Sequence, residues 1–589
     1  MGKLLVTSSD ERTWDFNRSM IFLGNWCKRF DRKHKWIKAD AEISKPYGIS
    51  FIQKEHNSVI AKNIEKKLIK KIIVLLNPIM KINYDERMWS ILIGPWLRRY
   101  STLMINRIGT LEKCLNDYNI SDIILETSKK NYLIFENSKL SMNAFENDVW
   151  NQYLYYEILQ FFNKKKINII KISHQEKKSK NKLKNRLSFK ILIINIIKFI
   201  SKFTNLLTYK NKIALINIYF KKWDQIKLHF KLSIFPYLRF ENNINKKILV
   251  DNNLRHSLKK ELEKEDFENL FEKISFSLFF KIFPICYLEG FHYYKNLTFT
   301  KTLPLNPKLI ISFVNLDTDE MIKFWTISKL EQGSNLLIYQ HGNNYGTHRY
   351  VNPSIDEDVA DKFITWGWGG ENKKYLNSKI INRYFHYQSH RKTFNKFKNI
   401  YLIENTMNPS YETFDSYFEY DKYFNEQLEF VQCLKKDIKN NLIIKLHSGL
   451  EIYSKYQEEL RWKNFDSSLN FIKPTTNFRK IIKKSKIIIF SYDSSGFLEC
   501  LANNIPTMCF WQNKFDHLRD DVKADYKLLL DSEIIFLSPI DIAKKINIIY
   551  NDIDTWWYSK KVQDAKVKFT NKYANTDNKD LYQLIKSLY

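Results

Sequence analysis

Residues 486–511 read KIIIFSYDSSGFLECLANNIPTMCFW, and this stretch decides the fold of the chain. An apolar run ends in the polar segment SYDSS, a helical pattern follows, and a second apolar run begins at Pro506. Strand, helix and strand in this order are typical of a parallel sheet that helices cover on both faces. We therefore expect an α/β fold around this stretch.

The same alternation extends to both sides, from about residue 308 onward. Helical patterns such as FNEQLEFVQCLKKDIKN, at 424–440, separate short apolar runs. The runs lie at 308–315, 335–342, 362–369, 399–406 and 441–448. In a parallel α/β sheet, ligands bind outside the carboxyl ends of the strands. Polar residues that follow these runs are therefore the candidate site residues.

The composition indicates a folded chain with more than one domain. It has 589 residues, of which 44% are apolar and 15% aromatic, and this excludes a largely disordered protein. Gly and Pro number only 14 and 12, which excludes collagen-like and low-complexity architectures. The length corresponds to about three or four domains, or to two large ones.

The formal net charge of +31 is compatible with nucleic acid, an anionic membrane face or an anionic substrate as partner. Residues 164–212 concentrate much of this excess, because they hold 15 Lys and Arg and the single acid Glu176. Lysines interrupt the helical apolar pattern at 189–207, so the segment 177–207 suits a helix on an anionic membrane surface. The alternative is a solvated lysine linker followed by an ordinary core helix. The most charged part lacks aromatic residues, and we expect no nucleic-acid binding.

Motifs that the sequence lacks disfavour several classes of enzyme. It has no GxxxxGK(S/T) phosphate loop, GxGxxG turn, HExxH zinc pair or GxSxG elbow. The six cysteines are scattered, without a CxxC pair. We therefore expect neither a cofactor nor a metal. No signal peptide or membrane-spanning run is recognisable, so we expect a cytoplasmic protein, held peripherally at the inner membrane if the basic segment binds lipid.

The segment Asp493-Ser494-Ser495-Gly496 carries the most specific candidate site. It lies where a strand gives way to a helix, so backbone N–H groups and two hydroxyls face outward at a positive helix end. Such an end binds anions and phosphates. Glu499, one turn into the helix, is placed to accept hydroxyls of a ribose. A serine pair that only caps the helix is the alternative.

Two further strand ends carry histidines. His447 follows Lys445 and precedes Ser448, and its imidazole is suited to donate to a nucleotide phosphate, although a lone histidine is more often structural. His341 precedes Gly342, whose backbone is free to turn sharply. A histidine there is suited to act as a general base or to donate to a developing anion.

The N-terminal segment TSSDERTW begins directly after the short apolar run LLV. Asp10 or Glu11 would supply a catalytic carboxylate at this strand end, and Arg12 a cation for an acidic substrate. A surface helix start is an equally economical interpretation, with Ser9 as N-cap and the two acids favouring the helix dipole.

The ordered segments LLIYQHGNNYG, IIKLHS and IIIFSYDSSGFLECLANNIPTMCFW resemble the motifs of the CDP-glycerol glycerophosphotransferases of teichoic acid synthesis. Bacterial sialyl- and polysialyltransferases, which hold CMP with a His-Pro and a Ser-Ser motif, are similar too. This wider resemblance covers about 335–515. The segments TSSDERTWDFNR, LGNWCKRFDRKH, LIGPWLRRY and DIDTWW resemble, more specifically, a family of transferases encoded in bacterial O-antigen clusters.

These resemblances imply a GT-B type fold, in which two Rossmann-like domains face a cleft. We expect 1–390 to form the acceptor-side domain, with 164–212 as a helical basic insertion, and 391–589 to bind the nucleotide donor. By similarity His447, Ser494 and Ser495 hold the nucleotide phosphates. The candidates for donor binding are Arg12, Gly342, Lys445, His447, Ser448, Asp493, Ser494, Ser495 and Glu499, and the catalytic candidates are Asp10, Glu11 and His341.

The function that the resemblance implies is transfer of a sugar from a CMP- or CDP-linked donor to a glycan or lipid-linked glycan of the bacterial surface, without a metal. A nonulosonic acid on CMP is the particular expectation. Ser448 stands where the resembling families have proline, and Gln340 where the teichoic enzymes have tryptophan. A CDP-glycerol-type glycerophosphotransferase is the alternative enzyme. A nucleic-acid-binding protein and a noncatalytic scaffold are the alternatives of another class.

Overall fold

A computed structural model gives the fold of the protein for most of the chain. The residues that it describes are 2–126, 131–162, 167–172, 211–220, 222–235, 247–297, 303–313, 316–350, 354–380, 393–404, 416–447, 456–511 and 514–588. The chain divides into two compact units. The first unit comprises Met1–Cys27, Lys35–Ile338 and Ile355–Asp361, and the second comprises Lys28–His34, Tyr339–Ser354 and Lys362–Tyr589.

The first unit begins with a five-stranded parallel sheet in the order β3-β2-β1-β4-β5. Its strands are β1 (Lys3–Val6), β2 (Met20–Phe22), β3 (Ala41–Ile43), β4 (Ile120–Glu126) and β5 (Asn168–Ile172). The side chains of Leu4, Val6, Trp14 and Phe22 belong to one buried hydrophobic cluster. This strand order places the switch of winding direction between β1 and β4, where doubly wound sheets bind ligands.

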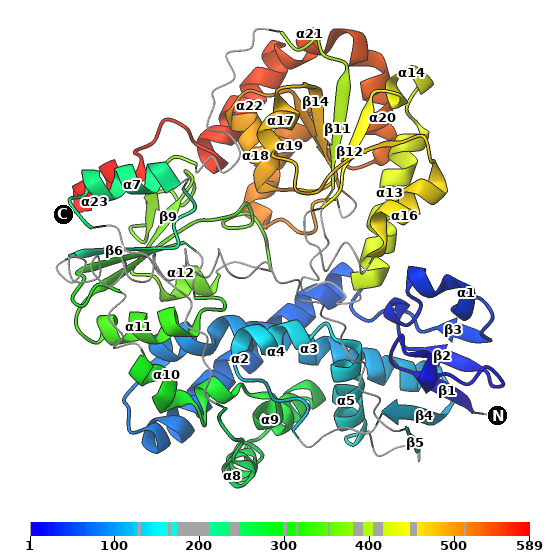
Figure 1. Ribbon diagram of the computed structural model, residues 1–589, viewed down its shortest axis with the longest axis vertical. Helices are drawn as coiled ribbons and strands as arrows, with labels where there is room; N and C mark the ends of the chain where they lie inside the picture. Colours follow the sequence, from blue (N-terminus) through cyan, green and yellow to red (C-terminus); the bar gives the residue numbers. More distant parts are fainter. Residues whose placement is uncertain are drawn as a thin grey trace, which may run out of the picture. The chain divides into compact units, whose positions relative to one another are not determined.

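Two long helices, α2 (Phe51–Met80) and α3 (Glu86–Asp117), run side by side in the first unit (Figure 1). The hydroxyl of Ser50 caps α2 by accepting from Gln53 N, and the Asp85 carboxylate caps α3 by accepting from Met88 N. The remaining helices before residue 338 are α1 (Lys33–Trp36), α4 (Ser138–Ala144), α5 (Asp148–Leu159), α7 (Lys222–Lys231), α8 (Asn252–Leu262), α9 (Leu270–Ile282), α10 (Phe291–Leu297) and α11 (Glu320–Leu330). The parallel strands β6 (Ile213–Ile216), β7 (Leu309–Ser312) and β8 (Asn335–Tyr339) and the short α12 (Ile355–Val359) complete it.

The second unit is built on a six-stranded parallel sheet in the order β13-β12-β11-β14-β15-β16. Its strands are β11 (Asn399–Ile403), β12 (Leu442–Lys445), β13 (Asn470–Ile472), β14 (Ser485–Phe490), β15 (Thr507–Phe510) and β16 (Ile535–Phe536). This is the order of a Rossmann sheet, with its switch point between β11 and β14. The strands β9 (Lys362–Thr365) and β10 (Tyr375–Asn377) pair in parallel in the same unit.

Helices connect the strands of the second unit and cover its sheet (Figure 1). They are α13 (Ser416–Gln432), α14 (Lys436–Lys439), α16 (Glu458–Phe465), α17 (Phe478–Ile482), α18 (Ser495–Ala502), α19 (Lys523–Asp531), α20 (Pro539–Ile549), α21 (Ile553–Trp557), α22 (Lys560–Tyr573) and α23 (Leu581–Leu588). All six residues of β14 are buried, as a central strand with helices on both faces requires.

The structure confirms the expected α/β class and the parallel sheets, two of which have the strand order of a Rossmann sheet. The apolar runs from residue 308 onward form β7, β8, β9, β11 and β12. The predicted division into 1–390 and 391–589 stays a prediction. The basic segment 177–207, with its expected amphipathic helix, lies outside the described residues.

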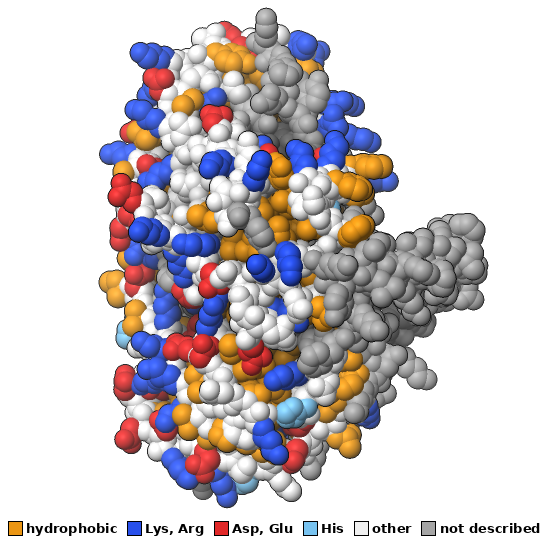
Figure 2. Space-filling view, turned by 90° about the vertical axis from the view of Figure 1, so that its left-hand side faces the viewer, with side chains coloured by type: hydrophobic (Ala, Val, Ile, Leu, Met, Phe, Trp, Pro, Cys, Tyr) orange, Lys and Arg blue, Asp and Glu red, His pale blue; other side chains and the backbone are white. Residues whose placement is uncertain are grey.

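Among the described residues, no helix combines the length and the apolar character that crossing a membrane requires. Figure 2 shows Lys and Arg side chains distributed over the face that it draws, with acidic side chains among them. On this face the basic excess is therefore dispersed over the surface.

Candidate active site

The carboxyl ends of β11, β12 and β14 lie at one edge of the second unit's sheet, because the three strands are parallel neighbours. The structure places the predicted serines at this edge. Ser494 is the N-cap of α18, and its Oγ accepts a hydrogen bond from Phe497 N at 3.2 Å. A Cβ on Gly496 would come within 2.9 Å of the Phe490 ring, so this glycine lets the helix start close to the strand. The predicted strand-to-helix turn is therefore present.

The loop after β8 is joined to the start of α18. Asn343 N donates to Ser495 Oγ at 3.1 Å, and Asn343 Nδ2 donates to Asp493 Oδ1 at 2.5 Å. The nearest heavy atom to a Cβ built on Gly342 would be Ser495 Oγ, at 3.9 Å. The structure thus brings together two predicted segments, the one at Gly342 and the one at Asp493-Ser494-Ser495.

Gln340 supports this loop from within. Only 1% of the residue is exposed, and its Oε1 accepts from Trp366 N at 2.9 Å and from Trp368 Nε1 at 2.7 Å. Its Nε2 donates to Gly342 O at 2.9 Å. The side chain that replaces the expected tryptophan is therefore a buried support of the loop and does not face a substrate.

His341 lies on the same loop with its ring orientation fixed. Its Nδ1 is 3.0 Å from the hydroxyl of Tyr345, and the two rings meet edge to face with centroids 5.1 Å apart. Tyr345 is itself buried and packs on Phe363. A fixed imidazole beside the start of α18 is suited to proton transfer or to hydrogen bonding with an anion.

Asp493 is a buried carboxylate at this edge. Burial works to raise its pKa, but contacts with His517 and Tyr526 outweigh it, so the pKa lies below the ordinary value and the group stays charged. Tyr526 Oη donates to Asp493 Oδ2 at 2.7 Å. Burial lowers the pKa of the neighbouring His348 to about 3, which keeps this imidazole neutral.

Lys445 is the last residue of β12 and His447 lies just after it, two strands from β14 in the sheet. Lys445 Nζ donates to Pro474 O at 3.2 Å, and burial lowers the pKa of the lysine. Burial and the neighbouring lysine lower the pKa of His447. A neutral imidazole at this strand end is suited to donate one hydrogen bond to a phosphate. Ser448, the next predicted residue, lies outside the described residues.

A pair of buried carboxyl groups, which was not predicted, lies at the switch point. Glu404 follows β11 directly and forms a side-chain hydrogen bond with Glu458 of α16. Glu404 Oε1 accepts from Trp462 Nε1 at 2.7 Å, and Glu458 accepts from Tyr420 Oη at 3.2 Å and from the backbone N–H of His447. Glu404 was open to prediction, because it is the first charged residue of the run at 399–406.

Burial raises the pKa of both carboxyl groups, that of Glu458 to about 7 and that of Glu404 well above its usual range. The repulsion that two adjacent carboxylates would feel adds to this effect on Glu404. A carboxyl group that keeps its proton donates the hydrogen bond that joins the pair. Because Glu458 also holds the backbone of His447, the pair positions that histidine.

Glu499 is fully buried within α18, with 0% of its surface exposed. Its backbone carbonyl accepts from Asn503 Nδ2 at 2.8 Å, which holds the end of the helix. Contact of Glu499 with a ribose or base stays a prediction, and it would require this side chain to become accessible.

In the first unit, Asp10 and Arg12 follow β1 and meet Glu126 at the end of β4. Arg12 donates through Nε to both Asp10 oxygens at 3.1 Å and through Nη2 to Glu126 Oε1 at 2.9 Å. Hydrogen bonding to Asp10 raises the pKa of Arg12, which therefore stays charged. Arg12 Nη1 is buried and has no hydrogen-bond partner in the described part of the chain. Glu126 was not among the predicted residues, and only its position as the last residue of β4 marks it.

Two tryptophans of the N-terminal segment hold the loop after β1. Trp14 Nε1 donates to Ser8 O at 3.2 Å, and Trp26 Nε1 donates to Thr7 O at 2.9 Å. Glu11 lies 3.8 Å from Lys35 Nζ. Three carboxylates, of Asp10, Glu11 and Glu126, and the guanidinium of Arg12 therefore lie together at the switch point of the first sheet.

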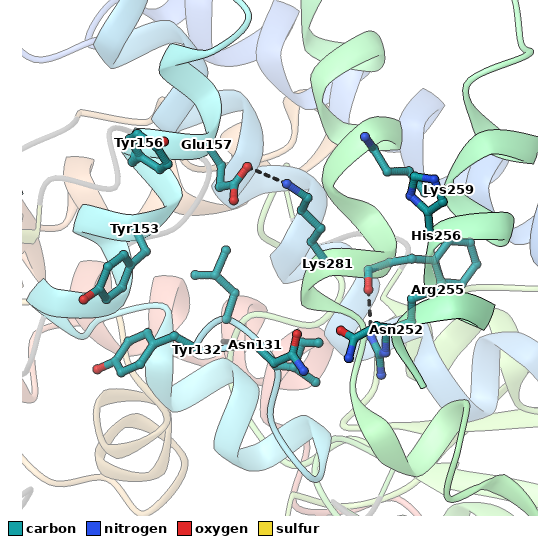
Figure 3. Close-up of a pocket in the computed structure, with 13 residues that line it drawn as sticks. Asn131, Tyr132, Tyr153, Tyr156, Glu157, Asn252, Arg255, His256, Lys259 and Lys281 are labelled. Atoms are coloured by element: carbon teal, nitrogen blue, oxygen red, sulfur yellow. Dashed lines mark hydrogen bonds and ion pairs between the residues drawn. The ribbon is translucent and has the colours of Figure 1, made fainter. Parts of the chain in front are cut away.

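A cavity of about 300 Å³ lies among α5, α8 and α9 of the first unit. Figure 3 shows Tyr132 and Tyr153 on one side of it and the α8 residues Arg255, His256 and Lys259 on the other. Its charges are largely paired, because Lys281 binds Glu157 at 2.6 Å and Arg255 binds Glu289 at 2.7 Å. Aromatic faces with paired charges around a cavity suit a neutral or weakly charged polar ligand.

The parallel sheets with polar clusters at their strand ends define a doubly wound α/β protein, a class in which ligands bind at the switch points. Residues 3–588 match the model of the LIC12162 family transferase, and the chain belongs to this family. It is therefore a transferase. No curated protein matches it in sequence.

Two solved structures are similar in part. The spinosyn rhamnosyltransferase SpnG complexed with thymidine diphosphate is 8% identical, with 48% of this chain and 73% of that chain covered and a TM-score of 0.28. The α,α-trehalose-phosphate synthase (UDP-forming) from Burkholderia vietnamiensis is 8% identical, with 53% and 74% covered and a TM-score of 0.28.

Proposed function

We propose that this transferase is a glycosyltransferase of bacterial surface polysaccharide synthesis, for O-antigen or capsule, that uses a nucleotide-activated sugar. The observation that carries the proposal is the junction of Asn343 with Asp493 and Ser495 at the start of α18. It fixes the hydroxyls of Ser494 and Ser495 at the positive N-terminal end of α18, and such an end binds the phosphates of a nucleotide.

In this proposal the leaving nucleotide phosphate is stabilised by the helix start and by His447. The N–H groups and the hydroxyls of Ser494 and Ser495 donate to oxygens whose negative charge grows as the bond to the sugar breaks. The pKa of His447 lies below its ordinary value, so the neutral imidazole donates a hydrogen bond at neutral pH without a change of charge.

The attacking hydroxyl of the acceptor loses its proton to a carboxylate of the first unit. We assign this role to Asp10 or Glu11 in an inverting reaction. Asp10 is bound by Arg12, which lowers the basicity of a carboxylate, and Glu11 has a longer contact, to Lys35. Arg12 would at the same time bind an acidic substrate group through its buried Nη1.

The donor in this proposal is a cytidine nucleotide, and specifically CMP that carries a nonulosonic acid. The resemblance to enzymes that pair a histidine with a Ser-Ser turn supports the cytidine. The buried Arg12 Nη1, which has no hydrogen-bond partner among the described residues, supports an acidic sugar, because a guanidinium N–H donates a charge-assisted hydrogen bond to a carboxylate.

The acceptor is a glycan or a lipid-linked glycan. The cavity bounded by Tyr132 and Tyr153 in the first unit supports this assignment, since aromatic faces pack against sugar rings. The basic segment 177–207 would hold the enzyme at an anionic membrane surface, where lipid-linked glycans are made. Loss of binding to anionic vesicles on deletion of 177–207 would test that role.

A CDP-glycerol-type phosphotransfer is the second candidate. It is favoured by the position of His341, which is oriented by Tyr345 on the loop that joins α18. In that reaction His341 would take the proton and the product would be a phosphodiester. Mass analysis of the product formed from CMP-nonulosonic acid and from CDP-glycerol separates the two functions, because only one leaves phosphorus in the product.

A further inference from the structure

Two histidines and a buried carboxylate of the second unit converge although they are far apart in sequence. One ring nitrogen of His348, one of His517 and one oxygen of Asp493 all lie within 4.8 Å of one another. In a zinc site the nitrogen and oxygen ligands lie about 2.0–2.2 Å from the ion, which puts them about 3–4 Å from one another. The three groups therefore need only a small adjustment to share an ion.

The backbone fixes the two histidines next to each other. His348 forms an antiparallel bridge with Leu518, in which Arg349 N donates to His517 O at 2.9 Å and Arg519 N donates to Thr347 O at 2.9 Å. The rings of His348 and His517 meet with centroids 4.9 Å apart. Their convergence thus follows from paired main chains and not from flexible side chains alone.

The carboxylate is held by outer partners of the kind that orient metal ligands. Asn343 Nδ2 donates to one oxygen of Asp493 and Tyr526 Oη donates to the other. Trp511 packs edge to face on the ring of His517, with centroids 5.4 Å apart. In metalloproteins, such outer contacts fix the orientation of the side chains that bind the metal ion.

One ligand atom of the cluster is left without a hydrogen bond. His517 Nε2 is buried, lies 3.6 Å from Asp493 Oδ2, and has no hydrogen-bond partner among the residues that the structure describes. A buried polar atom without a partner is unfavourable. A bound cation would satisfy the nitrogen lone pair and the carboxylate charge together.

We propose that His348, Asp493 and His517 form a binding site for a divalent transition-metal ion of the Zn²⁺ class. Two imidazoles and one carboxylate suit Zn²⁺ and its neighbours, whereas Ca²⁺ and Mg²⁺ prefer oxygen ligands alone. Three protein ligands leave a coordination position open, as in catalytic zinc sites. Local motifs do not show the site, because its three residues lie on three separate segments of the chain.

The test uses the full-length protein after treatment with a chelator. Isothermal titration with Zn²⁺ should give one saturating equivalent per chain, and Co²⁺ should produce a ligand-field absorption band at the same stoichiometry. His517→Ala and Asp493→Asn should each weaken Zn²⁺ binding by at least about tenfold. The control is His256→Ala, which removes an exposed histidine of the first unit and should leave binding unchanged.

Thermal unfolding with and without Zn²⁺ also shows whether each variant is folded, so that a misfolded variant is not mistaken for one that has lost only the site. Zn²⁺ should raise the melting temperature of the wild type and not that of His517→Ala or His348→Ala, because only a ligand of the folded state stabilises it. Absence of a saturable equivalent in the wild type would overturn the proposal. So would equal Zn²⁺ affinity in the wild type and in folded His517→Ala, since the cluster would then be a hydrogen-bonded support of the loop. Neither outcome involves a nucleotide, so the proposed function is tested separately.

Discussion

Asn343 and Ser495 lie 152 residues apart, and a hydrogen bond of 3.1 Å from Asn343 N to Ser495 Oγ joins them. The bond connects the loop after β8 to the first residue of α18. The bond holds the loop that carries His341 and Gly342 next to the serines. The two segments were predicted separately, each from the strand that precedes it.

Replacement of Ser495 by alanine should weaken nucleotide binding. The change removes a hydroxyl from the helix start and the acceptor of Asn343 N, so we expect about a tenfold loss of affinity for CMP or CDP in isothermal titration. Ser532→Ala is the control, because Ser532 is another hydrogen-bonded serine of the second unit. Equal losses in both variants would show that Ser495 acts on stability only.

Replacement of Gln340 by leucine should destabilise the second unit. The side chains have similar size, but leucine leaves Trp366 N and Trp368 Nε1 without acceptors, so we expect a loss of about 2–4 kcal/mol in the free energy of unfolding. Urea denaturation measures it. Gln432→Leu, at an exposed position, should change stability by no more than about 0.5 kcal/mol. A similarly small effect at Gln340 would contradict the role assigned to this side chain.

The pair of Glu404 and Glu458 should make stability depend on pH. The folded state keeps a proton that the unfolded chain releases near its ordinary pKa of 4.5, since burial raises the pKa of Glu458 to about 7 and that of Glu404 further. The folded state binds more protons in this window, so the free energy of unfolding should fall as pH rises from about 4.5 to 7.

Glu404→Gln should flatten that dependence. Its amide replaces the protonated carboxyl as a permanent donor to Glu458, so the variant should gain stability relative to the wild type at pH 8 but not at pH 5. A tenfold change in the proton affinity of one carboxyl group on folding corresponds to about 1.4 kcal/mol. Urea denaturation at the two pH values measures the gain. Glu371→Gln, at an exposed position, should follow the wild type, and a wild-type slope in Glu404→Gln would refute the shared proton.

Asp10→Ala should abolish turnover and keep donor binding. The carboxylate belongs to the first unit and contacts Arg12, so nucleotide affinity should stay within about twofold of the wild type while CMP release in the presence of acceptor is lost. Asp31→Ala is the control, because Asp31 likewise accepts two hydrogen bonds from an arginine two residues away. Normal turnover in Asp10→Ala would remove Asp10 as the base.

The sequence predicted the parts of the structure that depend on local pattern. The strand before Ser494 and the cap that this serine forms both follow from an apolar run that ends in a serine pair. The partners of these residues were not predictable. Asn343 meets Asp493, and Glu404 meets Glu458, only because loops of particular length return to one edge of the sheet.

The burial of Glu499 shows a second limit of prediction from the sequence. Its spacing from Ser495 places it one turn into α18, but periodicity does not reveal which face of a short helix a neighbouring element covers. Glu126 shows the converse, because it is the last residue of β4 and only the contact with Arg12, 114 residues away in the chain, places it at the candidate site.

The most direct test of the account is isothermal titration of the purified full-length protein with CMP, CDP, UDP and GDP, in the wild type and in a variant that carries both Ser494→Ala and Ser495→Ala. The account predicts that CMP or CDP binds with one site per chain, more tightly than UDP and GDP, and that the double variant weakens this binding by at least about tenfold. Binding of UDP or GDP with no binding of either cytidine nucleotide would contradict the assignment of the donor. Cytidine binding that is unchanged in the folded double variant would contradict the assignment of the site.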